Sequence, residues 1–238
     1  MRWLLSLIFH IYFFSWISVL LLGFWVFLPF PRIVLRQAIR VWCRLAVIGM
    51  YIFGGMRVKV VGREKIPAGP ALIACKHQSI WETFYMFLLV DDPQYVLKQE
   101  LLKIPFWGWY ADKTDQISVD RDAGAKALKG MVTKCVDRLK KGRQVIMFPE
   151  GTRTAPGAKV RYHPGVAAIY KTLPDNVPVV PVALNSGAHW GRREFLVYPG
   201  TITIEVQDPI YPGMERKAFI ALLEDRIETA STRLLEAG

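Results

Sequence analysis

The chain begins with a long apolar run, and no formally charged residue interrupts it between Trp3 and Phe30. A helix of this length suffices to cross the hydrocarbon core of a bilayer. The run is too long for the apolar part of a cleavable signal peptide, and no small-residue cleavage site follows it. The pattern therefore predicts a retained membrane anchor, and it leaves open whether the helix spans the bilayer or only dips into it.

A second helix is predicted from Arg32 to Phe53, an apolar segment with arginines at every fourth position: Arg32, Arg36, Arg40 and Arg44. Residues four apart share one helix face. Such a helix can lie in the membrane interface with its cations among lipid phosphates; the alternative is a long surface helix of a soluble bundle. Pro29 and Pro31 would separate the two helices. We therefore expect residues 1–55 to form a membrane-associated two-helix hairpin.

Beyond this hairpin, short β-rich segments alternate with helical ones. The predicted strands are Val58–Val61, Ala71–Ala74, Tyr95–Leu97, Ile117–Val119, Val145–Phe148, Val179–Leu184 and Thr201–Val206. The predicted helices are Ile80–Val90, Ala123–Lys140, Val166–Thr172 and Arg216–Leu235. This alternation predicts one α/β domain over residues 56–238, built on a mixed, mostly parallel sheet flanked by helices.

Polar side chains follow three of these strands directly, and ligands in such sheets bind at the carboxyl ends of strands. His77 follows the strand 71–74, Arg121 follows 117–119, and the segment 149–153 follows 145–148. These three strand ends are therefore the candidate site.

His77 and Glu82 are five residues apart, which would place their side chains roughly 140° apart on one regular helix. They can meet if His77 lies on a loop before a helix that begins near Ser79. Ser79 and Glu82 fit a capping box, in which the glutamate accepts a hydrogen bond from the backbone of the serine. Glu82 is thus either a helix cap or the carboxylate that orients His77 as a general base.

The segment FPEGTR at 148–153 brings a carboxylate, a glycine, a hydroxyl and a guanidinium together after a buried strand. Gly151 would let the backbone approach a ligand closely, and Arg153 is suited to hold a phosphate through two hydrogen bonds. The alternative is a turn with exposed charges. Arg121 is a second candidate anion ligand, and a surface salt bridge with Asp120 or Asp122 is its alternative.

The formal charge is +11, from 31 basic and 20 acidic residues, which suits anionic lipids or phosphorylated substrates. The chain carries no recognised nucleic-acid-binding motif. Cys43, Cys75 and Cys135 have neither disulfide-framework nor metal-ligand spacing, so we expect a reducing compartment and no metal or cofactor. Arginines cluster on the C-terminal side of the first helix, which places the main domain in the cytoplasm.

Four segments resemble, in order, the sequence blocks of the glycerolipid acyltransferases, the family that includes the 1-acylglycerol-3-phosphate acyltransferases. KHQSIWETF resembles the His-x4-Asp block; ISVDR at 117–121, FPEGTR at 148–153 and VPVVPV at 177–182 resemble the second, third and fourth. Residues 96–110 are similar to the connecting segment, so the resemblance covers roughly residues 58–184. Two departures concern Glu82, where the family usually has aspartate, and Lys113–Gln116, which replaces a glycine often found before the second block.

The resemblance implies transfer of a fatty acyl group from acyl-CoA or acyl carrier protein to the free hydroxyl of a lysophospholipid, first of all 1-acylglycerol-3-phosphate. It also implies a bacterial inner membrane as the location. His77 would be the general base and Glu82 would orient it. The remaining site residues would bind the acceptor: Glu150, Gly151 and Thr152 shape its pocket, with a backbone N–H there facing the oxyanion, and Arg121, Arg153 and more weakly Lys98 hold its phosphate.

Three other functions stay open at this point: an acyltransferase for a different lysolipid, a thioesterase that uses Cys75, and a non-enzymatic basic lipid-binding module. Cys75 lies two residues before His77, so on a strand both would point the same way. A buried cysteine at the end of an apolar strand is, however, commonplace. A lipid-binding module would explain the arginines, but not why polar groups follow three separate strands.

Overall fold

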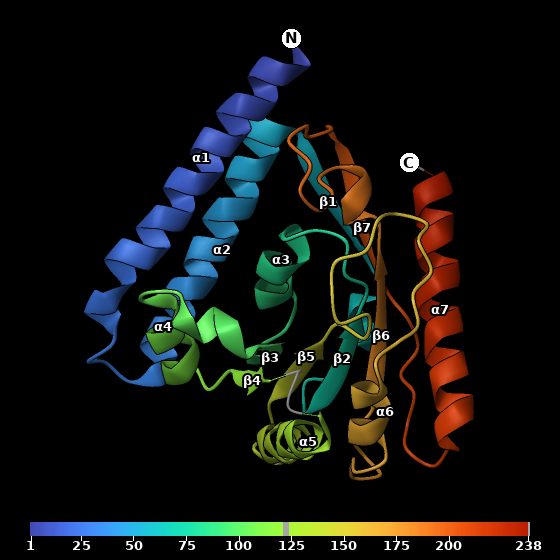
Figure 1. Cartoon of the computed structure of the whole chain (residues 1–238). Coiled ribbons are helices and arrows are strands. Elements are labelled where there is room, and N and C mark those ends of the chain that lie inside the picture. The colour runs from blue at the N-terminus through green and yellow to red at the C-terminus, as the bar shows by residue number, and fades with distance from the viewer. Residues whose placement is uncertain (121–123, 238) are drawn as a thin grey trace.

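The structure is a computed structural model that describes residues 1–120 and 124–237. Within these residues, seven strands form one sheet in the order β1-β7-β6-β2-β5-β3-β4 (Figure 1). The strands are β1 (Met56–Val61), β2 (Ala71–Cys75), β3 (Pro93–Lys98), β4 (Ile117–Val119), β5 (Gln144–Met147), β6 (Val179–Leu184) and β7 (Gly200–Val206). All neighbours run parallel except β6 and β7, which confirms the predicted mixed, mostly parallel sheet.

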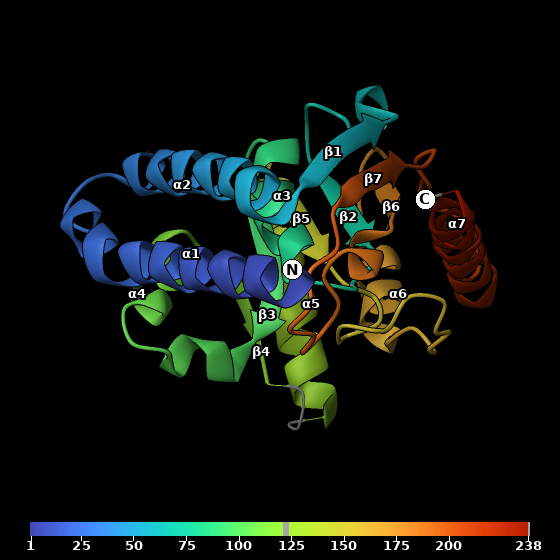
Figure 2. The same cartoon turned by 90° about the horizontal axis from the view of Figure 1, so that it is seen from above.

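Helices cover both faces of this sheet. They are α1 (Arg2–Gly23), α2 (Arg32–Gly54), α3 (Trp81–Leu89), α4 (Trp107–Lys113), α5 (Gly124–Lys140), α6 (Pro164–Tyr170) and α7 (Arg216–Glu236). Four short 3-10 turns in the described residues complete them: η1 (Phe24–Phe27), η2 (Arg63–Lys65), η3 (Gln99–Lys103) and η4 (Ser186–Ala188). Figure 2 shows α1 and α2 side by side, on the side of the molecule opposite α7. Helix α4 lies in the connecting segment, where the sequence pattern predicts no helix.

The central strands are buried on both faces, which explains their continuous apolar sequences. In β2, Ile73 and Cys75 pack into the core shared with α1, α2 and α3, whereas Leu72 and Ala74 pack into the core shared with α5, α6 and α7. Alternate residues of one strand therefore belong to two separate cores. This double burial fixes the register of β2 and with it the position of the residues that follow.

Helix α1 is attached to the α/β domain along its length. Near its start, the Ser6 Oγ accepts a hydrogen bond from the backbone N–H of Val197 at 3.1 Å. Near its end, the hydroxyl of Tyr110 donates to the carbonyl of Leu21 at 2.9 Å. By length and composition, Arg2–Phe27 is also the one segment of the described residues that could cross a membrane. In this structure it lies against the domain instead of extending away from it.

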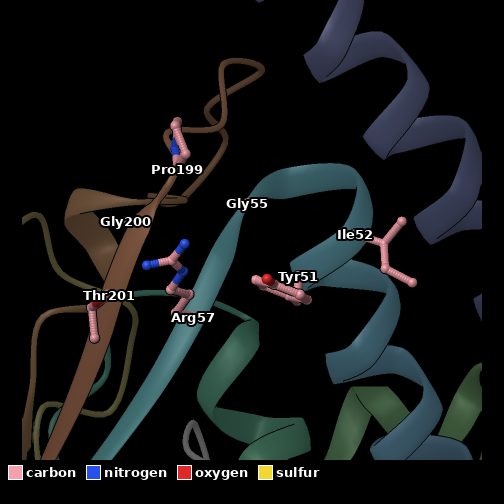
Figure 3. Close-up of a pocket in the computed structure, with 7 residues that line it drawn as sticks. All are labelled: Tyr51, Ile52, Gly55, Arg57, Pro199, Gly200 and Thr201. Atoms are coloured by element: carbon pink, nitrogen blue, oxygen red, sulfur yellow. The ribbon is translucent and has the colours of Figure 1, made fainter.

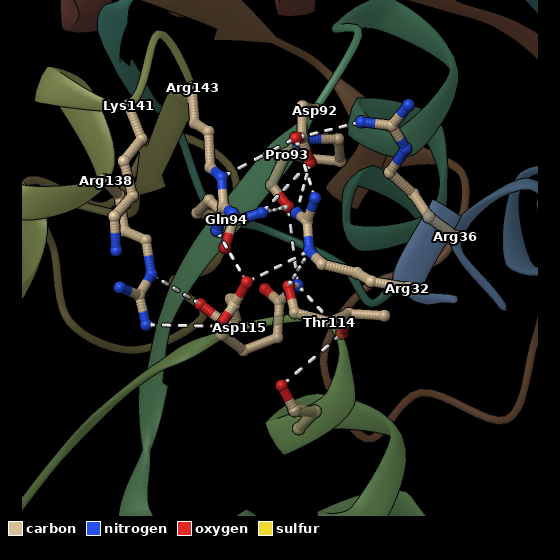
Figure 4. A network of polar contacts seen from close by, with 12 residues as sticks. Arg32, Arg36, Asp92, Pro93, Gln94, Thr114, Asp115, Arg138, Lys141 and Arg143 are labelled. Carbon is tan, nitrogen blue, oxygen red and sulfur yellow. Dashed lines mark hydrogen bonds and ion pairs between the residues drawn. The ribbon is translucent and has the colours of Figure 1, made fainter. Parts of the chain in front are cut away.

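The arginines of α2 bind the rim of the sheet (Figure 4). The Arg36 Nη1 lies 2.9 Å from the Asp92 Oδ2, and the Arg32 Nη1 donates to the same oxygen at 3.0 Å. Arg40 donates to the carbonyl of Val90 at 3.0 Å. The expectation that these three cations lie among lipid phosphates is therefore wrong, because residues distant in the sequence bind them.

Asp92 is the carboxylate at the centre of this network. Burial alone would raise its pKa, yet the hydrogen bonds and charges of Arg32 and Arg36 hold the pKa of Asp92 below its usual value. Asp115 is a second carboxylate of this network, and its Oδ2 accepts a hydrogen bond from the Arg143 Nη1 at 2.7 Å. The network fixes α2 to the side of the sheet that carries β3 and β4.

Candidate active site

The ends of β2 and β5 bring the first two candidate segments together. These strands are parallel neighbours, with Ala74 opposite Met147, so their carboxyl ends lie at the same edge of the sheet. The Glu150 Oε2 accepts the backbone N–H of His77 at 2.7 Å. The backbone N–H of Thr154 donates to the carbonyl of His77 at 2.9 Å. The loop after β5 thus holds the backbone of His77 on both sides.

Helix α3 begins at Trp81, so His77 lies on the loop before it. Glu82, in the first turn of α3, is fully buried. Its Oε1 accepts the backbone N–H groups of Gln78 and Ser79, each at 2.7 Å, and lies 2.9 Å from the His77 Nδ1. The two interpretations of Glu82 are therefore compatible, because the same oxygen caps the helix and contacts the imidazole.

The second carboxylate oxygen of Glu82 is held as well. The hydroxyl of Ser186, in η4 after β6, donates to the Glu82 Oε2 at 2.8 Å. Four hydrogen-bond donors from the protein thus surround a fully buried carboxylate. Such surroundings keep the orientation of the carboxylate constant.

The imidazole of His77 stacks on the ring of Phe148, with ring centroids 3.9 Å apart and an angle of 16° between the planes. Because Glu82 faces Nδ1, it favours the tautomer that carries the proton there and leaves the lone pair on Nε2. His77 lines the main cavity of the molecule. A neutral histidine in this tautomer has the geometry of a general base.

This cavity has a volume of about 960 Å³ and extends from His77 into the apolar layer between the sheet and the N-terminal helices. Its apolar lining includes Leu20, Ile39, Trp42, Phe84, Phe87 and Met131. Its polar lining includes the cationic residues Lys98, Arg153 and Arg192, the carboxylate residue Asp120, and Thr152 and His163. One cavity therefore offers space for a long apolar chain and cationic groups for an anion beside the histidine.

Gly151 adopts a φ of +70°, a conformation that favours glycine. A Cβ at this position would approach the Cδ2 of His163 to 2.5 Å. The backbone N–H of Gly151 donates to the carbonyl of Phe148 at 2.9 Å. Gly151 thus allows a tight turn against His163, and its own N–H donates within that turn. The oxyanion donor of this segment stays a prediction.

Glu150 lies behind the loop and does not line the cavity. Its Oε1 accepts the hydroxyl of Thr154 at 2.7 Å and lies 2.6 Å from the Nζ of Lys76. Lys76 is 1% exposed, and its Nζ also donates to both oxygens of Glu228 in α7 at 2.8 Å. The carboxylate of Glu150 supports the backbone of His77 and of its own loop, where the sequence pattern predicts a wall of the acceptor pocket.

Of the predicted phosphate ligands, Arg153 and Lys98 line the cavity, and Arg121 lies outside the described residues. Arg153 is half-buried, and this burial lowers its pKa from the ordinary value, as do the positive charges of Arg192 and Arg193. The Nζ of Lys98 donates to the Glu100 Oε1 at 3.2 Å, so a neighbouring carboxylate already shares its charge.

Arg192 is a cavity residue that the sequence motifs do not identify. It lies on the loop after η4, and its Nη1 donates to the Thr152 Oγ1 at 3.1 Å and to the carbonyl of Arg153 at 3.3 Å. The one signal in the sequence is the adjacent pair Arg192 and Arg193 shortly after the fourth block. Nothing in that pair indicates that the chain returns to the segment 152–153.

Cys75 is fully buried at the end of β2 and does not line the cavity. Burial, together with the charges of Glu82 and Glu150, raises the pKa of its thiol well above the ordinary value. A protonated thiol without access to the cavity is a poor nucleophile. These observations argue against a thioesterase that uses Cys75.

A second hollow, of about 470 Å³, lies near the start of β1 and β7 (Figure 3). It is lined by Tyr51, Ile52, Gly55, Arg57, Pro199, Gly200 and Thr201 and shares no residue with the main cavity. Its lining contains neither a histidine nor a carboxylate, so it has no counterpart of the pair formed by His77 and Glu82. Among the residues that the structure covers, no group of three or more His, Cys, Asp or Glu side chains is arranged to hold a metal ion.

Comparison of the sequence with known proteins identifies one protein family. The model of the family described as "Acyltransferase" matches residues 57–185. A 1-acyl-sn-glycerol-3-phosphate acyltransferase of Pseudomonas aeruginosa is 37% identical over 201 residues, which cover 84% of this chain and 77% of that protein. A protein of the same name from Saccharomyces cerevisiae is 25% identical over 68% of this chain, and the match spans 54% of its own length.

The fold has a counterpart among solved structures. The crystal structure of PlsC from Thermotoga maritima, described as a 1-acyl-sn-glycerophosphate acyltransferase, superposes with a TM-score of 0.80. The superposition covers 98% of both chains at 23% sequence identity. The likeness therefore extends over the N-terminal helices as well as the α/β domain.

Proposed function

This chain belongs to the acyltransferase family, and we propose that it moves a fatty acyl group from an acyl thioester to the free hydroxyl of 1-acylglycerol-3-phosphate, which gives phosphatidic acid. The observation that carries this proposal is the pair of His77 and Glu82, 2.9 Å apart beside a cavity of about 960 Å³. The acyltransferase of P. aeruginosa described above supports the choice of acceptor.

In the proposed reaction, the Nε2 of His77 accepts the proton of the acceptor hydroxyl as the oxygen attacks the thioester carbonyl. Glu82 stabilises the imidazolium that forms, because its carboxylate lies at Nδ1. The tetrahedral intermediate then releases the thiolate, which takes the proton from His77. Since a thiolate is a good leaving group, no covalent acyl-enzyme is needed.

The cavity suggests how the acceptor is placed. Its apolar part, beside α1, α2 and α3, suits the acyl chain that the acceptor already carries. Arg153 faces the other part of the same cavity, and a guanidinium binds phosphate well. Thr152 and Lys98 line the same cavity and are proposed as further donors. This placement brings the glycerol hydroxyl close to His77.

The acyl donor is proposed to be acyl-CoA or acyl carrier protein. Both present the fatty acid as a thioester, and both carry negative charge, which a chain of net charge +11 attracts. To distinguish acyl-CoA from acyl carrier protein, the activity of the purified protein in lipid is measured with each donor in combination with several lysolipid acceptors. No further cofactor is needed in this scheme.

We further propose that residues 1–55 hold the enzyme in the membrane surface and that residues 56–238 form the catalytic domain. Many large apolar side chains of α1 and α2 are exposed, including Leu4, Ile11, Leu22 and Ile52. Because α1 is bonded to the domain near both ends, we favour a helix pair that lies in one leaflet over one that spans the bilayer. The domain would then face the cytoplasm at the bacterial inner membrane.

The direct test supplies the purified protein with lysophosphatidate and an acyl thioester, and measures phosphatidate and free thiol. We expect equal amounts of both products from the wild type and from the Cys75→Ala variant. Thiol release without phosphatidate would instead identify a thioesterase. Lipid binding without thiol release would identify a binding module, and either result would overturn the proposal.

A further inference from the structure

Resting on the proposed function, we infer that Arg192 is a second ligand for the acceptor phosphate and that, with Arg153, it selects acceptors with a phosphate monoester. The two residues come from different loops, one after β5 and one after η4. Both line the cavity that also contains His77. Neither the strand-end pattern nor the four sequence blocks points to Arg192.

The position of Arg192 is set by contacts with the loop after β5, which carries Arg153. Its Nη1 donates to the Thr152 Oγ1 at 3.1 Å and to the carbonyl of Arg153 at 3.3 Å. In the part of the chain that the structure covers, these bonds use only Nη1 and leave the donors of Nη2 and Nε for a ligand. A guanidinium has five N–H donors and binds phosphate oxygens in pairs.

The charges around this pair favour an anion. Burial lowers the pKa of Arg153, the charges of Arg192 and Arg193 lower it further, and the charge of Glu82 acts in the opposite direction. Among residues 1–120 and 124–237, no carboxylate lies within 4.0 Å of the guanidinium of Arg153 or of Arg192. Because the charge of Arg192 affects the pKa of Arg153 more than the charge of Glu82 does, a negative ligand that binds between the two arginines would reduce the repulsion between them.

The loop that carries Arg192 is built against α1. Trp190 packs edge-to-face on Phe13, with ring centroids 4.7 Å apart, and Phe195 stacks on Trp3 at 4.8 Å. The carbonyl of Phe195 also lies 2.8 Å from the Nε2 of His10. Arg192 thus lies between two residues that are fixed to the N-terminal helix. Although Arg192 itself is exposed, its backbone is held at the side of the cavity.

A phosphate monoester suits this site better than a diester. Near neutral pH the monoester of lysophosphatidate carries close to two negative charges, whereas the diester of a choline lysolipid carries one negative charge beside a cation. Two guanidiniums balance the first and repel the cation of the second. The pair Arg153 and Arg192 would therefore make the enzyme prefer lysophosphatidate.

The test compares Arg192→Ala with Arg193→Ala. Arg193 is the matched control, because it is the next residue, is exposed, carries the same charge and does not line the cavity. In Arg192→Ala we expect the KM for lysophosphatidate to rise roughly 10- to 100-fold, as for the loss of a charge-assisted hydrogen bond. The KM for the acyl donor should stay unchanged. Arg193→Ala removes the same charge but no cavity-lining side chain, so it should raise the KM for lysophosphatidate far less than Arg192→Ala does.

A binding measurement separates this inference from the proposed function. Lysophosphatidate and monoacylglycerol, which lacks the phosphate, are titrated into His77→Ala protein with and without Arg192→Ala. We expect Arg192→Ala to weaken the binding of lysophosphatidate only. Equal affinities in both proteins, or a change confined to the KM of the donor, would overturn the inference. An inactive wild type that still binds lysophosphatidate through Arg192 would overturn only the proposed function.

Discussion

His77 is held from three directions, and each contact fixes a different property of it. The carboxylate of Glu150 fixes its backbone, the ring of Phe148 fixes the plane of the imidazole, and the carboxylate of Glu82 fixes its tautomer. General bases work best when such contacts leave one nitrogen free for the substrate proton. Among residues 1–120 and 124–237, the imidazole of His77 makes its hydrogen bond through Nδ1 and leaves Nε2 without a partner.

The Glu82→Gln variant separates the two proposed roles of Glu82, which are to cap helix α3 and to stabilise the imidazolium of His77. The amide oxygen can still accept the backbone N–H groups of Gln78 and Ser79, and the amide nitrogen can donate to the Ser186 Oγ. We therefore expect a melting temperature close to that of the wild type. The neutral amide does not stabilise the imidazolium, so kcat should fall roughly 10²-fold or more.

Steady-state kinetics and a thermal melt on the same preparation check this prediction. Glu64→Gln is a suitable control, because Glu64 is an exposed residue of η2 and does not line the cavity. If Glu82→Gln keeps the full kcat and also melts normally, Glu82 is only a helix cap.

At the scale of elements, the sequence predicts which residues follow the strands, but not the distant residues that hold them in place. The alternation of apolar and helical segments indicates β2 and β5, and the rule for parallel strands brings His77 and Glu150 to one edge. The contact between Lys76 and Glu228 spans 152 residues, so no local pattern contains it. The same holds for Arg192, which reaches the segment 152–153 across 39 to 40 residues.

For the arginines of α2, the sequence pattern predicts the helix correctly but not the anion that binds its cationic face. Their spacing predicts a helix with one cationic face, and the structure has that face. The anion that covers it is Asp92, which lies beyond β2 and α3 in the sequence. A lipid phosphate and an aspartate are equivalent partners as far as the sequence of α2 is concerned.

Lys76→Met tests how the C-terminal helix supports the site. The substitution leaves Glu150 and Glu228 as neighbouring carboxylates without their shared cation, and Glu150 is almost fully buried. We expect the free energy of unfolding to fall by about 3–5 kcal/mol, the usual cost of breaking a buried ion pair on one side. Denaturant unfolding followed by circular dichroism measures this change.

The matched control is Lys171→Met. Its Nζ lies 3.9 Å from the Glu215 Oε2, and both side chains are largely exposed, so its loss should cost at most about 1 kcal/mol. Equal stabilities of the two variants would show that the buried pair contributes no more than a surface pair. In that case α7 would not stabilise the loop that holds His77.

At the scale of the whole molecule, the N-terminal helices α1 and α2 form part of the cavity wall on one side and an exposed apolar surface on the other. Their inner sides line the cavity through residues such as Leu20, Ile39 and Trp42. Their outer sides expose large apolar residues to the surroundings. A cavity wall that is also the proposed membrane surface would let a lipid acyl chain reach His77 without crossing water.

The double variant Leu4→Glu, Ile11→Glu tests this proposed membrane surface. Both side chains are about 60% exposed, and residues seven apart lie on one face of a helix, so two carboxylates there oppose insertion among lipids. We expect less protein to co-sediment with vesicles of anionic phospholipid. Val61→Glu, on the edge strand β1, is the control and should sediment like the wild type. Unchanged sedimentation of the double variant would reject this surface.

The most direct test of the central claim is the turnover of His77→Ala, measured as phosphatidate formed from lysophosphatidate and an acyl thioester. If His77 is the general base, kcat should fall roughly 10²- to 10⁴-fold, while vesicle binding and lysophosphatidate affinity stay close to the wild type. A folded His77→Ala protein that forms phosphatidate at the wild-type rate would contradict the account.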